Sequence, residues 1–214
     1  MIKISPSDNA YFFECTKNAA AVSILSLREN HPLKETFLFD DEKEKLSNLK
    51  NEKRRLEFCA IRFIRNQKNI PFSIAYSPIG APYLVGSPMH VGISHSNDLV
   101  GLALAPFKIG LDIELISDRI LGIKNRFTTS QEVALFSYTE AMNFTIIWTI
   151  KEVLYKLAGR LEINLISELM INSVEGDTAN CLFLSAEGWR SVAVKFQEKN
   201  NYIISFNPSN YYEK

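Results

Sequence analysis

Residues 90–115, HVGISHSNDLVGLALAPFKIGLDIEL, carry three apolar runs separated by short polar or turn segments. Runs of this length that are rich in Val, Ile and Leu are typical of β-strands. We expect strands at Val91–Ser94, Leu99–Ala105 and Ile109–Leu115. The last run alternates apolar and acidic residues, which places Asp112 and Glu114 on one face of the strand and Leu111 and Ile113 on the other.

The segment on the N-terminal side of these strands has a helical pattern. Residues 40–68 lack Gly and Pro and repeat apolar residues at close to helical spacing, so we expect one or two helices that end before Pro71. Residues 50–68 contain seven basic and two acidic side chains, a net charge of +5 in 19 residues. Before them, residues 11–27 predict a first strand or two. The helices carry a local concentration of positive charge.

The C-terminal side repeats the order of helices followed by strands. We expect a helix over Gln131–Ala141 capped by Ser130, and another over Phe144–Ala158 capped by Asn143 and stopped by Gly159. Strand-like alternation follows at Leu182–Ser185, Val192–Phe196 and Tyr202–Phe206. Helix-plus-strand material therefore occurs on both sides of about residue 106, although no sequence repeat is visible at that period.

Composition excludes several classes of protein. The 214 residues are 46% hydrophobic, with 24 basic and 24 acidic side chains, which is unlike a disordered chain or a protein that coats nucleic acid or anionic membrane. No run approaches the ~18 apolar residues of a membrane span, and Met1–Asn9 does not resemble a secretory signal. Cys15, Cys59 and Cys181 are widely spaced, which favours free thiols, buried at Cys59 and Cys181, and a cytoplasmic location.

Three short patterns contain groups that can do chemistry. Asp112 and Glu114 lie about 7 Å apart on one strand face, which suits a bound cation or a solvated edge strand. On the second predicted helix, Glu152 lies between Trp148 and Tyr155, while Lys156 one turn on offers either a site residue or a surface ion pair.

The third pattern is Ser94-His95-Ser96 at the end of a strand. Adjacent residues on a strand point to opposite faces, so His95 is poorly placed to activate Ser94 as a nucleophile. A cluster of donors that grips an oxyanion or phosphate fits better, and a hydrogen-bonded turn is the alternative.

The order of these patterns resembles the 4′-phosphopantetheinyl transferase superfamily, with the closest likeness to its Sfp-type members. The likeness rests on Gly80-x-Pro82, Ile93-Ser94-His95-Ser96, Gly110-Leu111-Asp112-Ile113-Glu114, Arg126-Phe127 with Glu132, and Trp148-x-x-Lys151-Glu152-x-x-x-Lys156. It implies an α+β fold, a pseudo-dimer of two similar α/β halves, each a small, mostly antiparallel sheet packed with helices. We expect the halves at residues 1–105 and 106–214, packed as one globular unit.

The resemblance also implies an activity. Enzymes of this family transfer the 4′-phosphopantetheine moiety of coenzyme A to a serine of an apo acyl or peptidyl carrier protein, and release 3′,5′-ADP. The metal ligands for Mg²⁺ would be Asp112, Glu114 and Glu152. Glu152 would also act as the general base, and Lys156 would contact the diphosphate.

The remaining coenzyme A contacts follow from the same resemblance. Ser94 and His95 match phosphate-binding residues, and the basic segment offers Arg54, Arg55 and Arg62 for the 3′-phosphate. A lysine usual in the Gly-x-Pro run is replaced by Ala81, which predicts weaker coenzyme A binding, unless a residue such as Lys108 takes over the contact.

Partners and rival functions follow from this interpretation. An acidic carrier protein is expected to dock between Glu114 and Gln131, with Ile120, Leu121 and Phe127 as apolar contacts, and a monomer is expected, with neither nucleic acid nor membrane as a partner. One alternative is an inactive relative that serves as a carrier-protein or nucleotide binding module. The other is an unrelated metal-dependent phosphohydrolase, which would leave the +5 segment unexplained.

Overall fold

A computed structural model describes residues 10–14, 20–28 and 35–213 of the chain. The chain divides into two compact units, unit 1 at Met1–Pro106 and unit 2 at Phe107–Lys214. Both combine antiparallel strands with helices, which confirms the expected α+β class. Within the described ranges, no helix is both long and apolar enough to cross a bilayer.

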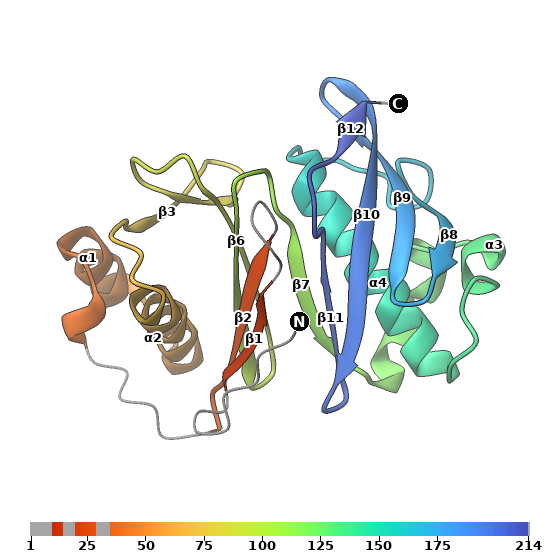
Figure 1. The fold of residues 1–214 in the computed structure, drawn as a ribbon. Helices are drawn as coiled ribbons and strands as arrows, with labels where there is room; N and C mark the ends of the chain where they lie inside the picture. The colour runs from red at the N-terminus through yellow and green to blue at the C-terminus, as the bar shows by residue number, and fades with distance from the viewer. Residues whose placement is uncertain (1–9, 15–19, 29–34, 214) are drawn as a thin grey trace. The chain divides into compact units, whose positions relative to one another are not determined.

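Unit 1 is an antiparallel sheet covered by a helix (Figure 1). Its elements are β1 (Ala10–Glu14), β2 (Ala21–Ser26), η1 (Glu35–Phe37), α1 (Asp40–Asn48), α2 (Glu52–Gln67), β3 (Ile74–Tyr76), β4 (Pro82–Leu84), β5 (His90–Ser96) and β6 (Leu99–Ala105). The sheet order is β1-β2-β6-β5, and β3 and β4 form a separate hairpin. Ala60, Ile61 and Ile64 of α2 belong to the same core cluster as Val100 and Leu102 of β6.

The charged segment of unit 1 forms two helices, as its pattern predicts. The side chain of Asn51 accepts a hydrogen bond from the Arg54 N–H at 3.0 Å and thereby caps α2. The helix ends at Gln67, before Pro71. The apolar stripe of α2 therefore faces the sheet, and the basic residues must divide between the interior and the surface.

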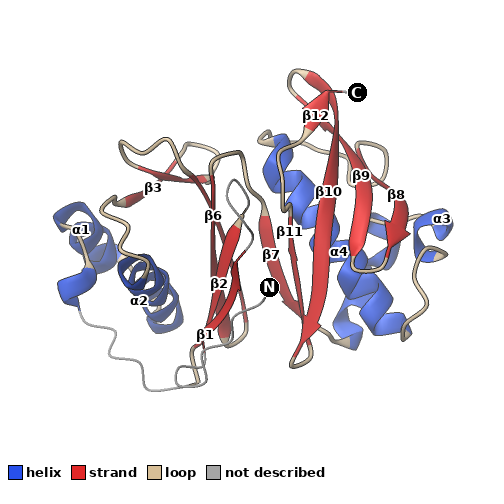
Figure 2. Ribbon diagram, viewed as in Figure 1, coloured by secondary structure: helices blue, strands red, loops and turns tan. Residues whose placement is uncertain are grey.

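Unit 2 is a larger antiparallel sheet with one long helix packed on it (Figure 2). Its elements are β7 (Leu111–Leu115), η2 (Asp118–Arg126), α3 (Ser130–Val133), α4 (Glu140–Ala158), β8 (Leu169–Glu175), β9 (Thr178–Ser185), β10 (Gly188–Lys199), β11 (Tyr202–Phe206) and β12 (Tyr212–Glu213). The sheet order is β7-β11-β10-β9-β8, with β12 paired to β10. Helix α4 packs against β7, β11 and β9.

The helix boundaries in unit 2 differ from the sequence prediction. The predicted helix over 131–141 is only the four-residue α3, and its cap is Thr129 rather than Ser130. Helix α4 begins at Glu140, before the expected cap Asn143. The Asn143 side chain accepts from the Tyr138 N–H at 3.0 Å, so it braces the preceding turn from inside the helix. The stop at Gly159 is confirmed, with φ of 64°.

A buried glutamate ties three elements together in unit 1. Glu42 of α1 is fully buried and forms ion pairs with Arg62 at 3.3 Å and Arg65 at 2.6 Å, both on α2. It also accepts a hydrogen bond from the Ile74 N–H of β3 at 3.0 Å. One carboxylate therefore joins the short helix, the long helix and the next strand.

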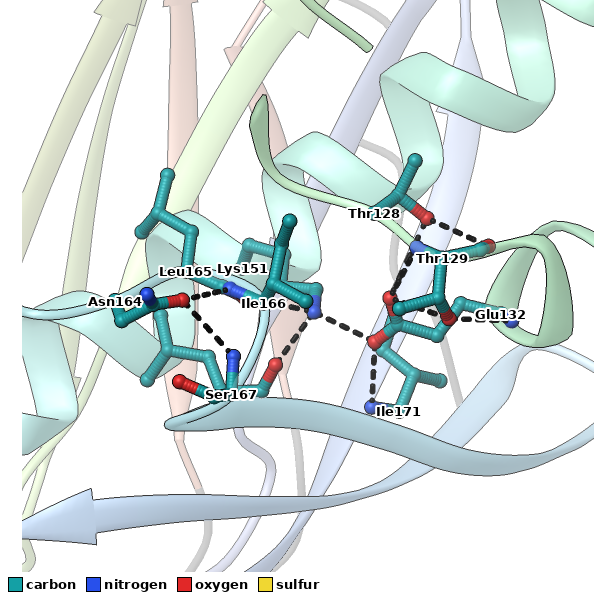
Figure 3. A network of polar contacts seen from close by, with 10 residues as sticks. Thr128, Thr129, Glu132, Lys151, Asn164, Leu165, Ile166, Ser167 and Ile171 are labelled. Carbon is teal, nitrogen blue, oxygen red and sulfur yellow. Dashed lines mark hydrogen bonds and ion pairs between the residues drawn. The ribbon is translucent and has the colours of Figure 1, made fainter. Parts of the chain in front are cut away.

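Unit 2 contains the same arrangement (Figure 3). Glu132 of α3 is buried and pairs with Lys151 of α4 at 2.6 Å. It accepts from the Ile171 N–H of β8 at 3.1 Å and from the Thr129 N–H at 3.0 Å. The two units therefore repeat one structural device, which sequence comparison misses because the cations differ in kind, number and spacing.

The described cysteines are free thiols. Cys181 is buried, and this burial raises the pKa of its thiol well above the usual range. Cys59 is half-buried, which is less than expected, and Cys15 lies outside the described residues.

Candidate active site in unit 2

The acidic face of β7 is turned toward α4. A Cβ placed on Gly110 would lie 2.7 Å from the Val153 carbonyl oxygen of α4. Side chains on alternate residues of a strand share a face, so Gly110, Asp112 and Glu114 all point to the helix side. The missing side chain of Gly110 allows the helix to approach closely, and this approach brings α4 over the two carboxylates.

A buried hydrogen bond fixes the register between this helix and the sheet. The Thr149 and Ser205 hydroxyls are 2.8 Å apart, and both residues are fully buried. Ser205 of β11 is directly paired with Asp112 of β7, and paired residues of antiparallel strands point to the same face. Thr149 lies one helical turn before Glu152. The contact therefore ties the helix that carries Glu152 to the strand that carries Asp112.

Replacement of Gly110 by alanine is expected to destabilise unit 2. The added Cβ would collide with backbone atoms of α4, which cannot rotate away, and overpacking of this kind costs about 1–3 kcal/mol. Urea unfolding of Gly110→Ala measures the loss. Gly122→Ala is the matched control, because a Cβ there meets open space. Equal stability of the two variants would contradict the close approach.

The ammonium group of Lys156 crosses from α4 to β7. Its Nζ donates to Asp112 Oδ1 at 2.8 Å and to the Leu111 carbonyl at 2.6 Å. Asp112 is buried and Lys156 is half-buried. The sequence offers two roles for Lys156, a site residue or a surface ion pair with Glu152 along the helix. In the structure, Lys156 forms its ion pair with Asp112 of β7. The Lys156 ammonium of α4 therefore lies on the acidic face of β7.

Glu152 has an unusual acid strength for a glutamate. Burial, followed by the negative charge of Asp112, raises the pKa of Glu152 from 4.5 to about 7, with a smaller rise from Glu114. The positive charge of Lys156 opposes the rise. The three carboxylates therefore influence one another, and Glu152 exchanges its proton near neutral pH. Perturbed carboxyls of this kind are typical of functional sites.

The same carboxylates are suited in kind to a hard divalent cation. Mg²⁺ prefers carboxylate oxygens and keeps water or phosphate in its remaining positions. However, in the described part of the chain no three His, Cys, Asp or Glu side chains are gathered closely enough to hold a metal. Asp112, Glu114 and Glu152 are electrostatically coupled, and Lys156 occupies one oxygen of Asp112. The donor chemistry fits Mg²⁺, whereas the described residues do not form a closed chelating cluster.

Lys151, next to Glu152 in sequence, points toward Glu132 of α3 (Figure 3). Its Nζ pairs with Glu132 and donates to the Leu165 carbonyl at 3.0 Å, and the side chain is fully buried. Burial lowers the pKa of Lys151, and the hydrogen bond that Lys151 donates to Glu132 opposes this change. The sequence motif contains Lys151 without indicating its role. That role is to anchor α4 in the interior while the next residue faces the site.

Unit 1 has its own cluster of charged groups around His95. Arg54 Nη1 lies 2.8 Å from His95 Nε2, and Glu57 Oε1 lies 3.5 Å from His95 Nδ1. Arg54 is exposed and His95 is partly exposed. Ser94 is buried and, as its neighbour on β5, points to the opposite face. The structure brings Arg54 and His95 together, but it does not bring Ser94 to them.

Two of the arginines expected to bind phosphate, Arg62 and Arg55, form hydrogen bonds within unit 1 instead. Arg62 is 1% exposed and bonds Glu42 and the Ile74 carbonyl, so its guanidinium lies in the interior and not at a surface site. Arg55 is half-buried and donates to the Leu46 and Leu49 carbonyls at the end of α1, at 2.6 and 3.3 Å. The prediction that Arg62 binds the 3′-phosphate is therefore wrong. Arg55 caps the C-terminal end of α1 through these two hydrogen bonds.

The expected docking segment contains one similar correction. Phe127 is fully buried against Phe144 and Trp148, so it belongs to the core and not to a docking surface. Ile120 and Leu121 of η2 are half-buried and pack against the same core, with part of each side chain outside.

Ala81 stands where the family usually has a lysine, and Lys108 is the residue expected to take over its contact. Ala81 lies exposed in the turn before β4. Lys108 is half-buried, and its Nζ would lie 2.5 Å from a Cβ placed on Gly159. Lys108 therefore lies over the C-terminal end of α4, where a helix attracts positive charge.

Comparison with protein families finds a match within unit 2. No curated protein matches the chain. Residues 108–207 match the family model described as ACPS, the 4′-phosphopantetheinyl transferase superfamily. The matched range contains Asp112, Glu114, Glu152 and Lys156, and it covers nearly all of unit 2. Unit 2 is therefore similar to the 4′-phosphopantetheinyl transferase superfamily over the whole of its candidate site.

Proposed function

We propose that the protein is a Mg²⁺-dependent 4′-phosphopantetheinyl transferase of the Sfp type. The reaction moves the phosphopantetheine arm of coenzyme A to a serine hydroxyl of an apo acyl or peptidyl carrier protein, with 3′,5′-ADP as the second product. One observation supports this proposal above the others. Glu152, with a pKa of about 7, lies within electrostatic reach of Asp112, Glu114 and Lys156, inside the segment that matches the superfamily.

The mechanism follows from the chemistry of these side chains. A general base works best when its pKa is close to the working pH, and Glu152 meets this condition in the metal-free protein. Its role is to accept the proton of the carrier serine as the hydroxyl oxygen attacks the β-phosphorus of coenzyme A. Lys156 would leave Asp112 to donate to the diphosphate and so offset the negative charge of the leaving 3′,5′-ADP.

The metal belongs to the same proposal. Asp112, Glu114 and Glu152 would hold Mg²⁺, which supplies positive charge to the diphosphate oxygens. The Lys156 ammonium partly neutralises Asp112. The chain's contribution is a helix and a strand held in fixed register by Gly110 and by the Thr149–Ser205 hydrogen bond.

Arg54 and His95 are the proposed phosphate-contacting residues of unit 1. Arg54 is exposed and always charged, and a guanidinium presents donors in a planar fork that matches phosphate oxygens. Arg55 and Ser94 are weaker candidates, because Arg55 already holds the end of α1 and Ser94 is buried. We further propose that the carrier protein docks on η2, where Ile120 and Leu121 retain exposed surface.

The test is a transfer assay read by mass spectrometry. The purified chain is mixed with coenzyme A, MgCl₂ and an apo carrier protein, and the carrier is weighed before and after. A gain equal to one phosphopantetheine group, lost when EDTA is added, supports the proposal. Binding of carrier without any mass gain would favour the binding-module alternative, and phosphate release without a carrier would favour the hydrolase.

A further inference from the structure

A buried carboxylate lies beneath the exposed cations of unit 1. Glu57 of α2 is 6% exposed, whereas the side chains around it are open, with exposed fractions of 57% for Lys53, 61% for Arg54 and 36% for His95. Glu57 lies 4.0 Å from Lys53, 3.5 Å from Arg54 and 3.5 Å from His95. All three partners therefore converge on one carboxylate at the base of the cluster.

The geometry decides which nitrogen of His95 carries the proton. Arg54 Nη1 lies 2.8 Å from His95 Nε2, and a guanidinium is only a donor. Nε2 is therefore the accepting nitrogen, and the neutral ring carries its hydrogen on Nδ1. Nδ1 is the nitrogen that faces Glu57 Oε1. The carboxylate and the guanidinium select the same tautomer from opposite sides of the ring.

The burial of Glu57 strengthens its electrostatic attraction for Arg54 and for the Nδ1–H group of His95. A carboxylate that is shielded from water attracts nearby donors more strongly than an exposed one does. Lys53 and Arg54 each keep further N–H donors that Glu57 does not use, and both side chains are more than half exposed. Glu57 thus holds the cations on one side and leaves their other donors for an anion.

We propose that Glu57 is a positioning residue that holds Arg54 and the Nδ1–H form of His95 in place for phosphate binding. The inference rests on the proposed function, because it takes Arg54 and His95 as the phosphate contacts. Glu57 itself does not touch the phosphate, which its negative charge would repel. The chemical class of ligand is a phosphate monoester of a nucleotide.

The experiment uses the full chain and two independent readouts. Ring ¹⁵N NMR reports the tautomer of His95, assigned by comparison with His95→Gln, and calorimetry reports the affinity for 3′,5′-ADP. Wild-type protein is expected to show the Nδ1–H tautomer. In Glu57→Leu the ring is expected to move toward the Nε2–H tautomer, and the Kd to rise about tenfold, the size of one lost hydrogen bond to a charged group.

Two variants complete the design. Glu57→Gln keeps an oxygen acceptor and is expected to retain the Nδ1–H tautomer, with an affinity between those of wild type and Glu57→Leu. Glu52→Gln changes an exposed acid on the same helix and is expected to leave both readouts unchanged. If Glu57→Leu does not fold, the wild-type tautomer and Glu57→Gln still test the inference.

Two results would overturn the inference. One is an Nε2–H tautomer in wild-type protein, and the other is a folded Glu57→Leu with the tautomer and Kd of wild type. A failure of the proposed function is distinguishable from both. In that case the wild-type chain neither binds 3′,5′-ADP nor modifies a carrier, while the tautomer readout still reports on Glu57 and His95.

Discussion

Glu152→Gln is expected to reduce phosphopantetheine transfer by at least about a hundredfold, the lower end of the contribution of a general base. The amide keeps the shape of the side chain and removes both its basicity and its negative charge. Mass spectrometry of the carrier protein at saturating coenzyme A and MgCl₂ measures the rate. Glu140→Gln, an exposed change on the same helix, is the matched control.

The same substitution is expected to stabilise the metal-free protein above pH 7. The carboxyl of Glu152 has a pKa of about 7 when folded, against 4.5 for an ordinary glutamate. Between these values the folded state holds a proton that the unfolded chain has released, so stability falls as the pH rises through this window. The loss in the free energy of unfolding is complete above about pH 7 and amounts to as much as about 3 kcal/mol. A glutamine at this position does not ionise, so the variant does not lose this stability.

Urea unfolding in EDTA at pH 4.5, 6 and 8 tests this expectation. Wild type and Glu152→Gln should be equally stable at pH 4.5, where the wild-type carboxyl is protonated in the folded state. They should diverge progressively toward pH 8. Addition of MgCl₂ at pH 8 should then stabilise wild type and leave Glu152→Gln largely unaffected. A constant difference at all three pH values would show that Glu152 titrates normally.

The elements of unit 2 that carry the site are readable from sequence. The alternation of residues 111–115 gives a strand with both acids on one face, and the apolar stripe of residues 146–157 with Gly159 gives the helix and its end. These signals are local, since each depends on residues within a few positions of one another. Their order along the chain resembles the 4′-phosphopantetheinyl transferase superfamily, and the match over residues 108–207 supports the likeness at the level of the superfamily.

The residues that the sequence misassigns depend on contacts between distant positions. The +5 charge of residues 50–68 predicts a basic surface, yet Arg62 and Arg65 are buried on Glu42, which is 20 and 23 residues away. Glu57 is an ordinary helix residue in sequence, but it lies beside His95 of a strand that comes much later. Helical periodicity indicates which face is buried, and it does not indicate that a buried face contains charges. Arg54 remains as the exposed cation next to His95.

Glu42→Gln is expected to cost about 3–5 kcal/mol of stability, because removing one partner leaves the buried cations uncompensated. Arg62 and Arg65 are 1% and 2% exposed and would keep their full charge without the carboxylate. A loss of this size is a large fraction of the total stability of a typical domain. Urea unfolding of the full chain, followed by a probe in unit 1, measures it.

An exposed ion pair in the same unit, Asp98–Arg28, serves as a control that shows whether burial or distance determines the loss of stability. Asp98 lies 2.7 Å from Arg28, nearly the same as the 2.6 Å between Glu42 and Arg65, but its side chain is 39% exposed and that of Arg28 is 75% exposed. Asp98→Asn is therefore expected to cost less than about 1 kcal/mol. Replacing Glu42, Arg62 and Arg65 together by apolar residues of similar size should recover most of the loss, because no unpaired charge remains inside. A Glu42→Gln protein as stable as Asp98→Asn would mean that water reaches the buried cluster and that the device shared by the two units does not hold the helices in place.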